Sequence, residues 1–432
     1  MKKLIVFLFV LVCSIVSADD YNFTNTLIGE RAFGLAGAFT ALSDDSSGCY
    51  YNPAGIAFVD RSSLSLSSTV YSFQTLRTEN AFQHLEAGVI DAESSVMTPI
   101  PSTVATVKKI YDFLTVGICA IVPDYTHITI ETMITVNNAL YSLRRNLTDQ
   151  TLFVGPTAAY KILDNLSVGM SVFYATRTYS LSNTLTNTED ITVTSPLITI
   201  STSDTYIDHS AFLLLFGVKY DPTPDVHLGL SIRTPSIKKS GKGSVFLTIV
   251  DENSNFTAGT NLLFPANNLG AETKYPMKMA AGVAYGRKKE FMVSFDSTLF
   301  VGSNYNLTEI GSGGSAVVIG AVEQKNIVNF ALGGEYYFKE EFPVRLGAYT
   351  NLSANSVERV EEDLNYDKID YFGGTLGVGY ESKNSSLNLG LSYALGSGKS
   401  SRSFGETVDN MTVKDFSGSQ LGILIGGSYY FD

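Results

Sequence analysis

From residue 62 to the C-terminus, hydrophobic and polar residues alternate with a period of two, which is the pattern of β-strands. In the last segment, QLGILIGGSYYFD, Leu421, Ile423 and Ile425 share one face, opposite glycine and serine. The segments SLNLGLSYAL and EFMVSFDSTLF repeat the pattern. A transmembrane barrel strand requires apolar residues outside and small or polar residues inside over about ten residues, although strands of a soluble sandwich also alternate.

The lengths of the connections separate these two classes of protein. Strands are expected at 62–74, 100–109, 113–123, 151–161, 166–181, 209–220, 225–235, 276–286, 290–301, 326–338, 342–351, 370–382, 386–396 and 419–431. Connections at one end are short turns, whereas those at the other end run for roughly 17 to 40 residues, which is the asymmetry of outer-membrane barrels. We therefore predict an all-β fold, an antiparallel transmembrane β-barrel of about 14 strands spanning residues 62–432.

The chain begins with the three parts of a secretory signal peptide. Lys2 and Lys3 form the positive end, residues 4–16 form the apolar stretch, and Val16-Ser17-Ala18 is the expected cleavage site. Cys13 would fit a lipoprotein signal, but the bulky Val12 before it disfavours that interpretation. Residues 1–18 are therefore expected to be removed during export.

Residues 19–61 do not alternate but are rich in glycine and alanine, and Asn52-Pro53-Ala54-Gly55 is typical of a turn. A fourteen-strand barrel has an open lumen unless another segment fills it. We therefore predict that residues 19–61 form an N-terminal plug inside the lumen. Within this segment, Asp44 and Asp45 are expected to cap a turn rather than to bind a metal ion.

Composition narrows the function classes. Charged residues make up 17% of the chain, against roughly 25% in soluble domains. The net charge of −12 argues against nucleic acid as a partner. The histidines, His84, His127, His209 and His227, belong to no recognisable catalytic or metal-binding motif, so no enzyme activity, cofactor or metal is expected. Cys49 and Cys119 remain after the signal peptide and allow one disulfide without demonstrating it.

Several stretches resemble the FadL/TodX family of outer-membrane transporters for long-chain fatty acids and aromatic hydrocarbons. They are RAFGLAGAFTALSDDSSGCYYNPAGIA in the plug, IPSTVATVKKIYDFLTVGICAIVP, and FGVKYDPTPDVHLGLSIRTP. Later hairpins, such as FALGGEYYFKEEFPVRLGAY, match barrels in general. The resemblance covers most of the chain, and the departures from it are concentrated in the long loops.

The resemblance implies a location and a route. The protein is expected in the bacterial outer membrane, inserted by the barrel-assembly machinery and surrounded by outer-membrane lipid. By this resemblance, fatty acids or similar hydrophobic molecules are expected to be captured in an apolar groove under the extracellular loops and to move passively toward the plug. They are then expected to leave sideways through a gap at a kinked third strand, here residues 113–123. Gly117 and Pro123 are the candidates for this lateral gate, since glycine marks irregular strand positions.

Residues of the strands and loops supply further candidates. The expected loop 236–275 is unusually apolar, which indicates either a ligand site or an upward extension of the barrel strands. Its candidate ligand-binding residues are Val245, Phe246, Leu247, Phe256, Leu262, Leu263 and Phe264. The charged residues expected to face the lumen are Arg177, Lys219, Arg233, Lys278, Asp296, Glu335 and Arg345. Most of these should contact the plug or water, and a basic one could meet a ligand carboxylate.

The sequence thus favours a transporter for hydrophobic molecules. The main alternative is a barrel of the same superfamily that acts as a scaffold or docking component of a secretion or surface assembly. A polar porin is a third class, and the apolar loop argues against it.

Overall fold

The computed structural model describes residues 21–78, 92–136, 138–189, 191–193, 197–251, 262–310, 317–362, 366–401 and 413–431. The expected signal peptide, His84 and Phe256 lie outside these ranges. Within the described part of the chain, none of the helices has the length and hydrophobicity that crossing a membrane demands.

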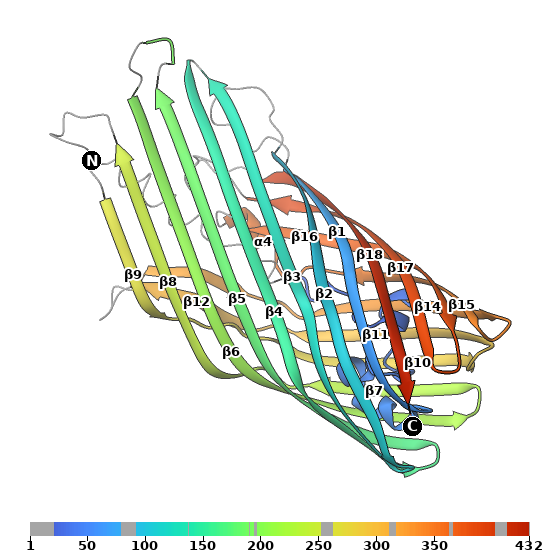
Figure 1. The fold of residues 1–432 in the computed structure, drawn as a ribbon. Coiled ribbons are helices and arrows are strands. Elements are labelled where there is room, and N and C mark those ends of the chain that lie inside the picture. The colour runs from blue at the N-terminus through green and yellow to red at the C-terminus, as the bar shows by residue number, and fades with distance from the viewer. Residues whose placement is uncertain are drawn as a thin grey trace.

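The described strands form a closed antiparallel barrel (Figure 1). One sheet contains 16 strands, of which β8 and β9 attach beside β6, and the other fourteen close into a ring because β18 pairs with β1. The ring consists of β1 (Ser62–Thr78), β2 (Ala92–Tyr111), β3 (Leu114–Val136), β4 (Ala139–Leu163), β5 (Leu166–Glu189), β6 (Leu197–Thr223), β7 (Val226–Arg233), β10 (Met277–Arg287), β11 (Phe291–Val301), β14 (Ile327–Phe338), β15 (Phe342–Asn351), β16 (Asp367–Glu381), β17 (Ser385–Ser400) and β18 (Lys414–Phe431). Each ring strand overlaps one expected strand, so the fourteen-strand prediction is confirmed.

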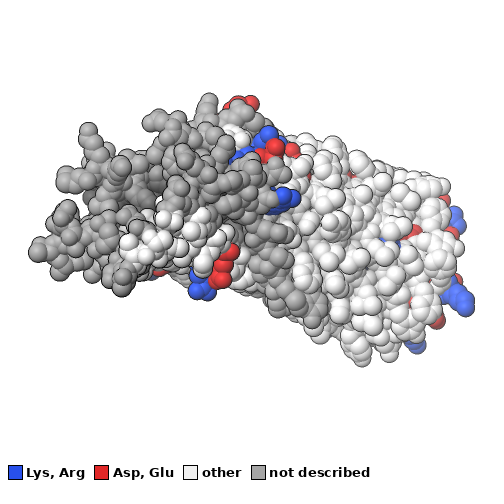
Figure 2. Space-filling view, turned by 90° about the horizontal axis from the view of Figure 1, so that it is seen from above, with Lys and Arg blue, Asp and Glu red and all other residues white. Residues whose placement is uncertain are grey.

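Alternation along these strands produces an apolar outer belt. Outward side chains such as Leu66, Leu346 and Phe372 are about 60% exposed. Figure 2 shows this part of the outer surface almost without charge, with lysine, arginine and acidic residues gathered at its two borders. A surface of this kind is stable only when lipid covers it.

The barrel wall is much taller on one side than on the other (Figure 1). Strands β4, β5 and β6 contain 25, 24 and 27 residues, whereas β14 and β15 contain 12 and 10. The segment 236–275 is mostly not a loop, because β8 (Ile237–Asp251) and β9 (Leu262–Gly270) form a hairpin on β6. A second hairpin consists of β12 (Asn304–Ile310) and β13 (Val317–Glu323).

Residues 21–61, here called the plug, fill the lumen and appear in blue inside the ring in Figure 1. The plug contains α2 (Glu30–Gly34), α3 (Gly48–Tyr51) and the 3-10 helix η1 (Pro53–Phe58). These helices are short because glycine and proline interrupt the segment. Ile28, Leu35, Phe39 and Ile56 are fully buried, so the plug has an apolar core that it shares with the wall.

Candidate functional site

One face of the plug packs directly on the backbone of the wall. This close-packed face consists of residues 52–58 against β4, β5 and β6. A Cβ atom on Gly169 would lie 2.4 Å from the carbonyl carbon of Pro53, so only glycine admits this approach. The buried Asn52 amide donates to the Thr40 oxygen at 2.9 Å and to the Val218 oxygen at 3.0 Å. Its own oxygen accepts from the Ala54 N–H and starts η1.

The opposite face of the plug is held by charges. This ionic face consists of Glu30, Arg31 and Asp44 against β14 to β18 and the turn after β10. Arg31 bridges Asp44 at 2.5 Å and Glu335 at 2.8 Å. Arg345 contacts the same Glu335 at 2.6 Å, so two of the expected inward charges do contact the plug network. Lys288, in the turn, reaches Asp44 at 3.3 Å.

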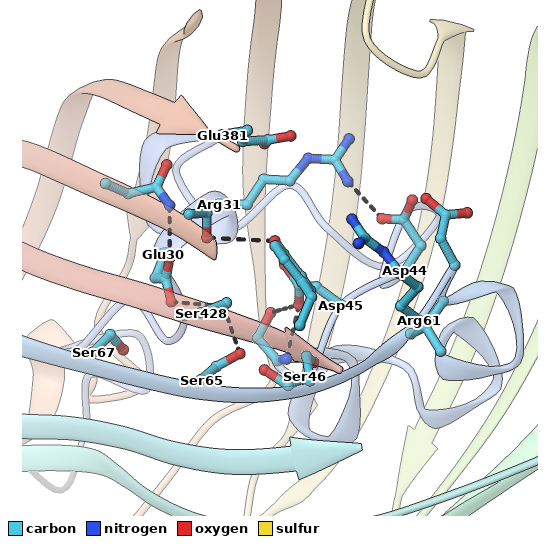
Figure 3. A pocket seen from close by; sticks show the side chains of 18 of the residues that line it. Glu30, Arg31, Asp44, Asp45, Ser46, Arg61, Ser65, Ser67, Glu381 and Ser428 are labelled. Atoms are coloured by element: carbon cyan, nitrogen blue, oxygen red, sulfur yellow. Dashed lines mark hydrogen bonds and ion pairs between the residues drawn. The ribbon is translucent and has the colours of Figure 1, made fainter. Parts of the chain in front are cut away.

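A polar cavity of about 130 Å³ lies along the ionic face (Figure 3). Glu30 projects toward it and accepts hydrogen bonds from the Asn388 amide at 2.6 Å and the Ser428 hydroxyl at 3.1 Å. Burial raises the pKa of Glu30 to about 7. Burial would also raise the pKa of Asp44, but Arg31 and Lys288 outweigh it and hold that pKa well below its usual range.

The acidic pair in the plug has two different roles. Burial raises the pKa of Asp45, whose carboxylate accepts from the Ser47 N–H at 2.8 Å and the Ser47 hydroxyl at 2.5 Å. Asp45 therefore caps the turn before α3, as expected. Asp44 instead joins the ion-pair network, which the sequence pattern did not indicate. Among the described residues, His, Cys, Asp and Glu form no cluster that would hold a metal ion.

A cavity of about 70 Å³ lies beside the plug, bordered by aromatic rings and by an unpaired cation. Phe153, Tyr275 and Tyr50 line it together with Arg233. The Arg233 guanidinium lies 6.0 Å from the centre of the Phe153 ring and donates to the Pro276 oxygen at 3.1 Å. Its Nε has no partner, and none of the described carboxylates forms an ion pair with it.

Lys278 borders a third cavity, of about 50 Å³, which Tyr50 also lines. Its ammonium lies 5.0 Å from the centre of the Tyr50 ring and, in the part of the chain described, makes no ion pair. The other expected inward cations differ from these two. Arg177 pairs with Asp149 at 2.6 Å, and Lys219 donates to the Ala41 oxygen at 2.6 Å. Asp296 accepts from the plug N–H groups of Phe39 and Thr40.

The pairing of two neighbouring wall strands ends beside the cavity of Arg233. Strands β2 and β3 pair from Tyr111↔Leu114 to Thr103↔Ile121, and their ladder ends there. Beyond it, β2 continues along β1, and β3 continues along β4 after a register shift between Ile121 and Asp124. Pro123 lies in that shift and borders the cavity of Arg233. Pro99 and Pro101, on β2, have no N–H to offer a neighbouring strand.

The break does not lie where the glycine of the third strand suggested. Gly117 pairs with Val107 on one side and Thr157 on the other, without a register shift. A Cβ atom there would lie 2.7 Å from the Thr106 oxygen. The ladder is thus regular at Gly117, where glycine lets two strands pack closely, and a role of Gly117 in a lateral gate stays a prediction.

The expected loop residues divide between the two faces of the hairpin on β6. Val245 and Leu247 are buried on the inner face, where Val245 packs with Ile207 and Tyr179 in an apolar cluster of the upper lumen. Phe246 points outward and is 39% exposed, so it lies away from that cluster. Leu262, Leu263 and Phe264 lie on β9, where their backbones pair with β8.

One family model matches nearly the whole chain, and several solved structures share its fold. A family model described as outer membrane protein transport protein (OMPP1/FadL/TodX) matches residues 9–426. A FadL homologue of Pseudomonas aeruginosa is 14% identical with a TM-score of 0.67, and the match covers 95% of this chain and 100% of that one. The toluene transporter TodX of P. putida is 14% identical with a TM-score of 0.66, covering 95% and 99%. The toluene transporter TbuX of Ralstonia pickettii is 15% identical with a TM-score of 0.61, covering 94% and 100%. No curated protein is significantly similar to the chain.

Proposed function

The chain belongs to the outer membrane protein transport family of OMPP1, FadL and TodX, and from this membership we propose that it conducts hydrophobic molecules passively across the bacterial outer membrane. Two of the similar structures are toluene transporters, which supports an apolar cargo. The family is one of transport proteins, in agreement with the expectation that the chain is not an enzyme.

Capture of the cargo is assigned to the upper lumen. The inner face of the tall wall carries Ile128, Leu147, Tyr179 and Val245, which form one apolar cluster. Burial of apolar surface contributes about 25 cal/mol per Å², so a long acyl chain gains affinity here without a charged partner. Val245 and Leu247 serve this step, whereas the outward Phe246 does not contact the cargo.

Arg233 carries the proposal on the chemistry of the cargo. Burying a cation costs free energy unless the cation is paired and hydrogen-bonded. Among the described residues, no carboxylate pairs with Arg233. The aromatic cavity around it would receive the end of an acyl chain, and a terminal carboxylate would supply the missing acceptor for its Nε. We therefore favour fatty acids over neutral hydrocarbons, with Lys278 as a second cation on the path.

Lateral exit is assigned to the gap between β2 and β3. The cavity of Arg233 reaches Pro123, where the ladder between these strands has ended. A hydrophobic molecule that leaves there enters the bilayer and avoids the periplasmic water. Pro123 thus remains part of the proposed gate, and Gly117 is replaced by Pro101 on the opposite side of the gap.

Replacing Arg233 with methionine tests the cargo. We expect Arg233→Met to weaken oleate binding roughly 10- to 100-fold, because a hydrogen bond to a charged group contributes about 1.5–3 kcal/mol. Binding of hexadecane should not change. Arg144→Met is the matched control, since Arg144 lies on the outer face of β4 and is paired with Glu131.

Equal losses for oleate and hexadecane would assign Arg233 a purely structural role. Native mass spectrometry of the purified barrel tests the broader function. Retained fatty acid supports the channel, whereas co-purifying proteins without any lipid would favour the scaffold alternative.

Restoring backbone donors beside the gap tests the exit. The double variant Pro101→Val, Pro123→Val should let β2 and β3 pair further, because valine offers an N–H and favours strands. We expect slower uptake of labelled oleate with unchanged binding and unchanged heat-modifiable gel mobility. Pro156→Val is the control, since Pro156 pairs with Ile118 on β3 without a register shift. Unchanged uptake in the double variant would place the exit elsewhere.

A further inference from the structure

One cysteine of the plug and one cysteine of the wall belong to the same buried cluster. Cys49 belongs to α3 of the plug, and Cys119 points into the lumen from β3. Both are free and buried, with exposed fractions of 0% and 2%, and they belong to the same apolar cluster. The thiol of Cys119 donates weakly to the Gly155 oxygen at 3.8 Å, and α3, which carries Cys49, packs on β3. The fold thus brings together two cysteines separated by 70 positions, which is 119 minus 49.

The number of cysteines in the chain limits the disulfides that can form. The chain contains three cysteines, and Cys13 lies in the expected signal peptide, so Cys49 and Cys119 are the only two that follow it. A channel of the bacterial outer membrane assembles through the periplasm, an oxidising compartment in which protein disulfides form and persist. Each of these thiols therefore has one intramolecular partner available.

We propose that Cys49 and Cys119 form a disulfide that ties the plug to β3 below the gap in the wall. The proposal depends on the outer-membrane location of the chain and not on the identity of the cargo.

Thiol–disulfide exchange with a periplasmic protein disulfide supplies the chemistry. The thiolate of one cysteine attacks a sulfur of the donor, forming a mixed disulfide and releasing one donor thiolate. The second cysteine then displaces the other donor sulfur. The two cysteines lose two protons and two electrons, and the donor gains them as two thiols. Since both thiols are buried in the folded protein, exchange takes place before the plug is fully docked.

The disulfide would restrict movement of the plug at α3. Cys119 is fixed in the wall by its pairing with Ala105 and Gly155, four residues before Pro123. The bond would hold α3 against this strand while the cargo passes, so the plug could not leave the lumen as a unit. Any opening movement is then confined to the ionic face on the other side.

The oxidation state of the protein isolated from outer membranes tests the proposal. Membranes are denatured without reductant in the presence of iodoacetamide, which then reaches any free thiol, and the protein is weighed by intact mass spectrometry. We expect a main species that lacks two hydrogens and carries no alkyl group. A reduced sample should take up two alkyl groups, and the Cys49→Ala variant should take up one. Two alkyl groups on the unreduced protein, or a disulfide between two chains, would overturn the proposal.

Ion conductance in urea tests whether the disulfide holds the plug in the barrel. The barrel is placed in a planar bilayer, and urea is added at a concentration that releases the plug but leaves the wall intact. We expect the wild-type protein to conduct ions only after a reductant is added, whereas Cys49→Ala conducts in urea alone. Equal conductance of the two proteins without reductant would show that no covalent tether holds the plug.

Discussion

The two faces of the plug are held in the lumen by different forces. On the close-packed face, Gly169 and Gly217 let the plug backbone approach the wall directly. On the ionic face, Arg31 and Arg345 share Glu335, and a polar cavity runs beside them. Close packing depends little on solvent conditions, whereas a cluster of partly hydrated charges responds to pH and to the loss of any single partner. The ionic face is therefore the side on which the plug can be loosened selectively.

The largest effect is expected from removing the central cation of the ionic face. Arg31→Met leaves Asp44 and Glu335 with one cationic partner fewer, and breaking a buried ion pair in this way costs about 3–5 kcal/mol. Hydrogen exchange should accelerate in residues 29–34 and remain slow in residues 52–58. Arg287→Met is the control, since its pair with Asp225 is exposed and contributes little. Equal acceleration of both segments would mean that the plug unfolds as one unit and that the two faces are not independent.

A smaller effect is expected from crowding the close-packed face. Gly169→Val places side-chain atoms where the Pro53 and Ala54 backbone lies, and overpacking of this kind costs about 1–3 kcal/mol. Exchange should now accelerate in residues 52–58 and not in residues 29–34. Gly334→Val is the matched control, because the nearest atom to its added Cβ is 4.0 Å away. If Gly169→Val left exchange unchanged, the plug would have room to shift away from β5.

The smallest effect is expected from pH. Because the pKa of Glu30 in the folded protein is raised to about 7, its contribution to docking is fully present below the usual carboxyl pKa and is lost as pH rises through about 7. Asp45, whose pKa is also raised, changes in the same direction. The ionic face should be weaker at pH 8 than at pH 5, on the order of 1–2 kcal/mol. Glu30→Gln should reduce this dependence, measured as exchange in residues 29–34 against pH. A face that tightens as pH rises would contradict the assignment.

Alternation alone located the ring strands, because inward and outward side chains of a barrel differ strongly in polarity. Alternation did not predict the strand ends beyond the apolar outer belt. There the outer face of β5 and β6 carries polar residues such as Ser182 and Asp204, and the strands continue through them. The same limit made the segment of β8 and β9 resemble a loop. At Gly117 the sequence left two structures open, because a glycine in a strand signals either an interruption or a close approach, and the structure shows the close approach.

The candidate site could be predicted only in part. Alternation correctly placed Arg233 and Glu335 on the lumen face. Whether each has a partner depends on which strands become neighbours and on where the plug lies, and both are set by long-range packing. The sharing of Glu335 by Arg31 and Arg345 joins a plug helix to two strands, so the pattern of a single strand does not reveal it. The unpaired state of Arg233 likewise became visible only with its neighbours in place.

The closure of the ring by β1 and β18 has a consequence for the order of folding. The Glu30 carboxylate is bonded to Ser428, 398 positions away, so this contact has nearly the highest contact order that the chain permits. Contacts of such separation form late, because the loop entropy of the intervening chain opposes them. The partners of the close-packed face, on β4 to β6, are nearer in sequence and available earlier. We therefore expect the plug to settle first on β4 to β6, and the ionic face to be completed only when the last strand seals the barrel.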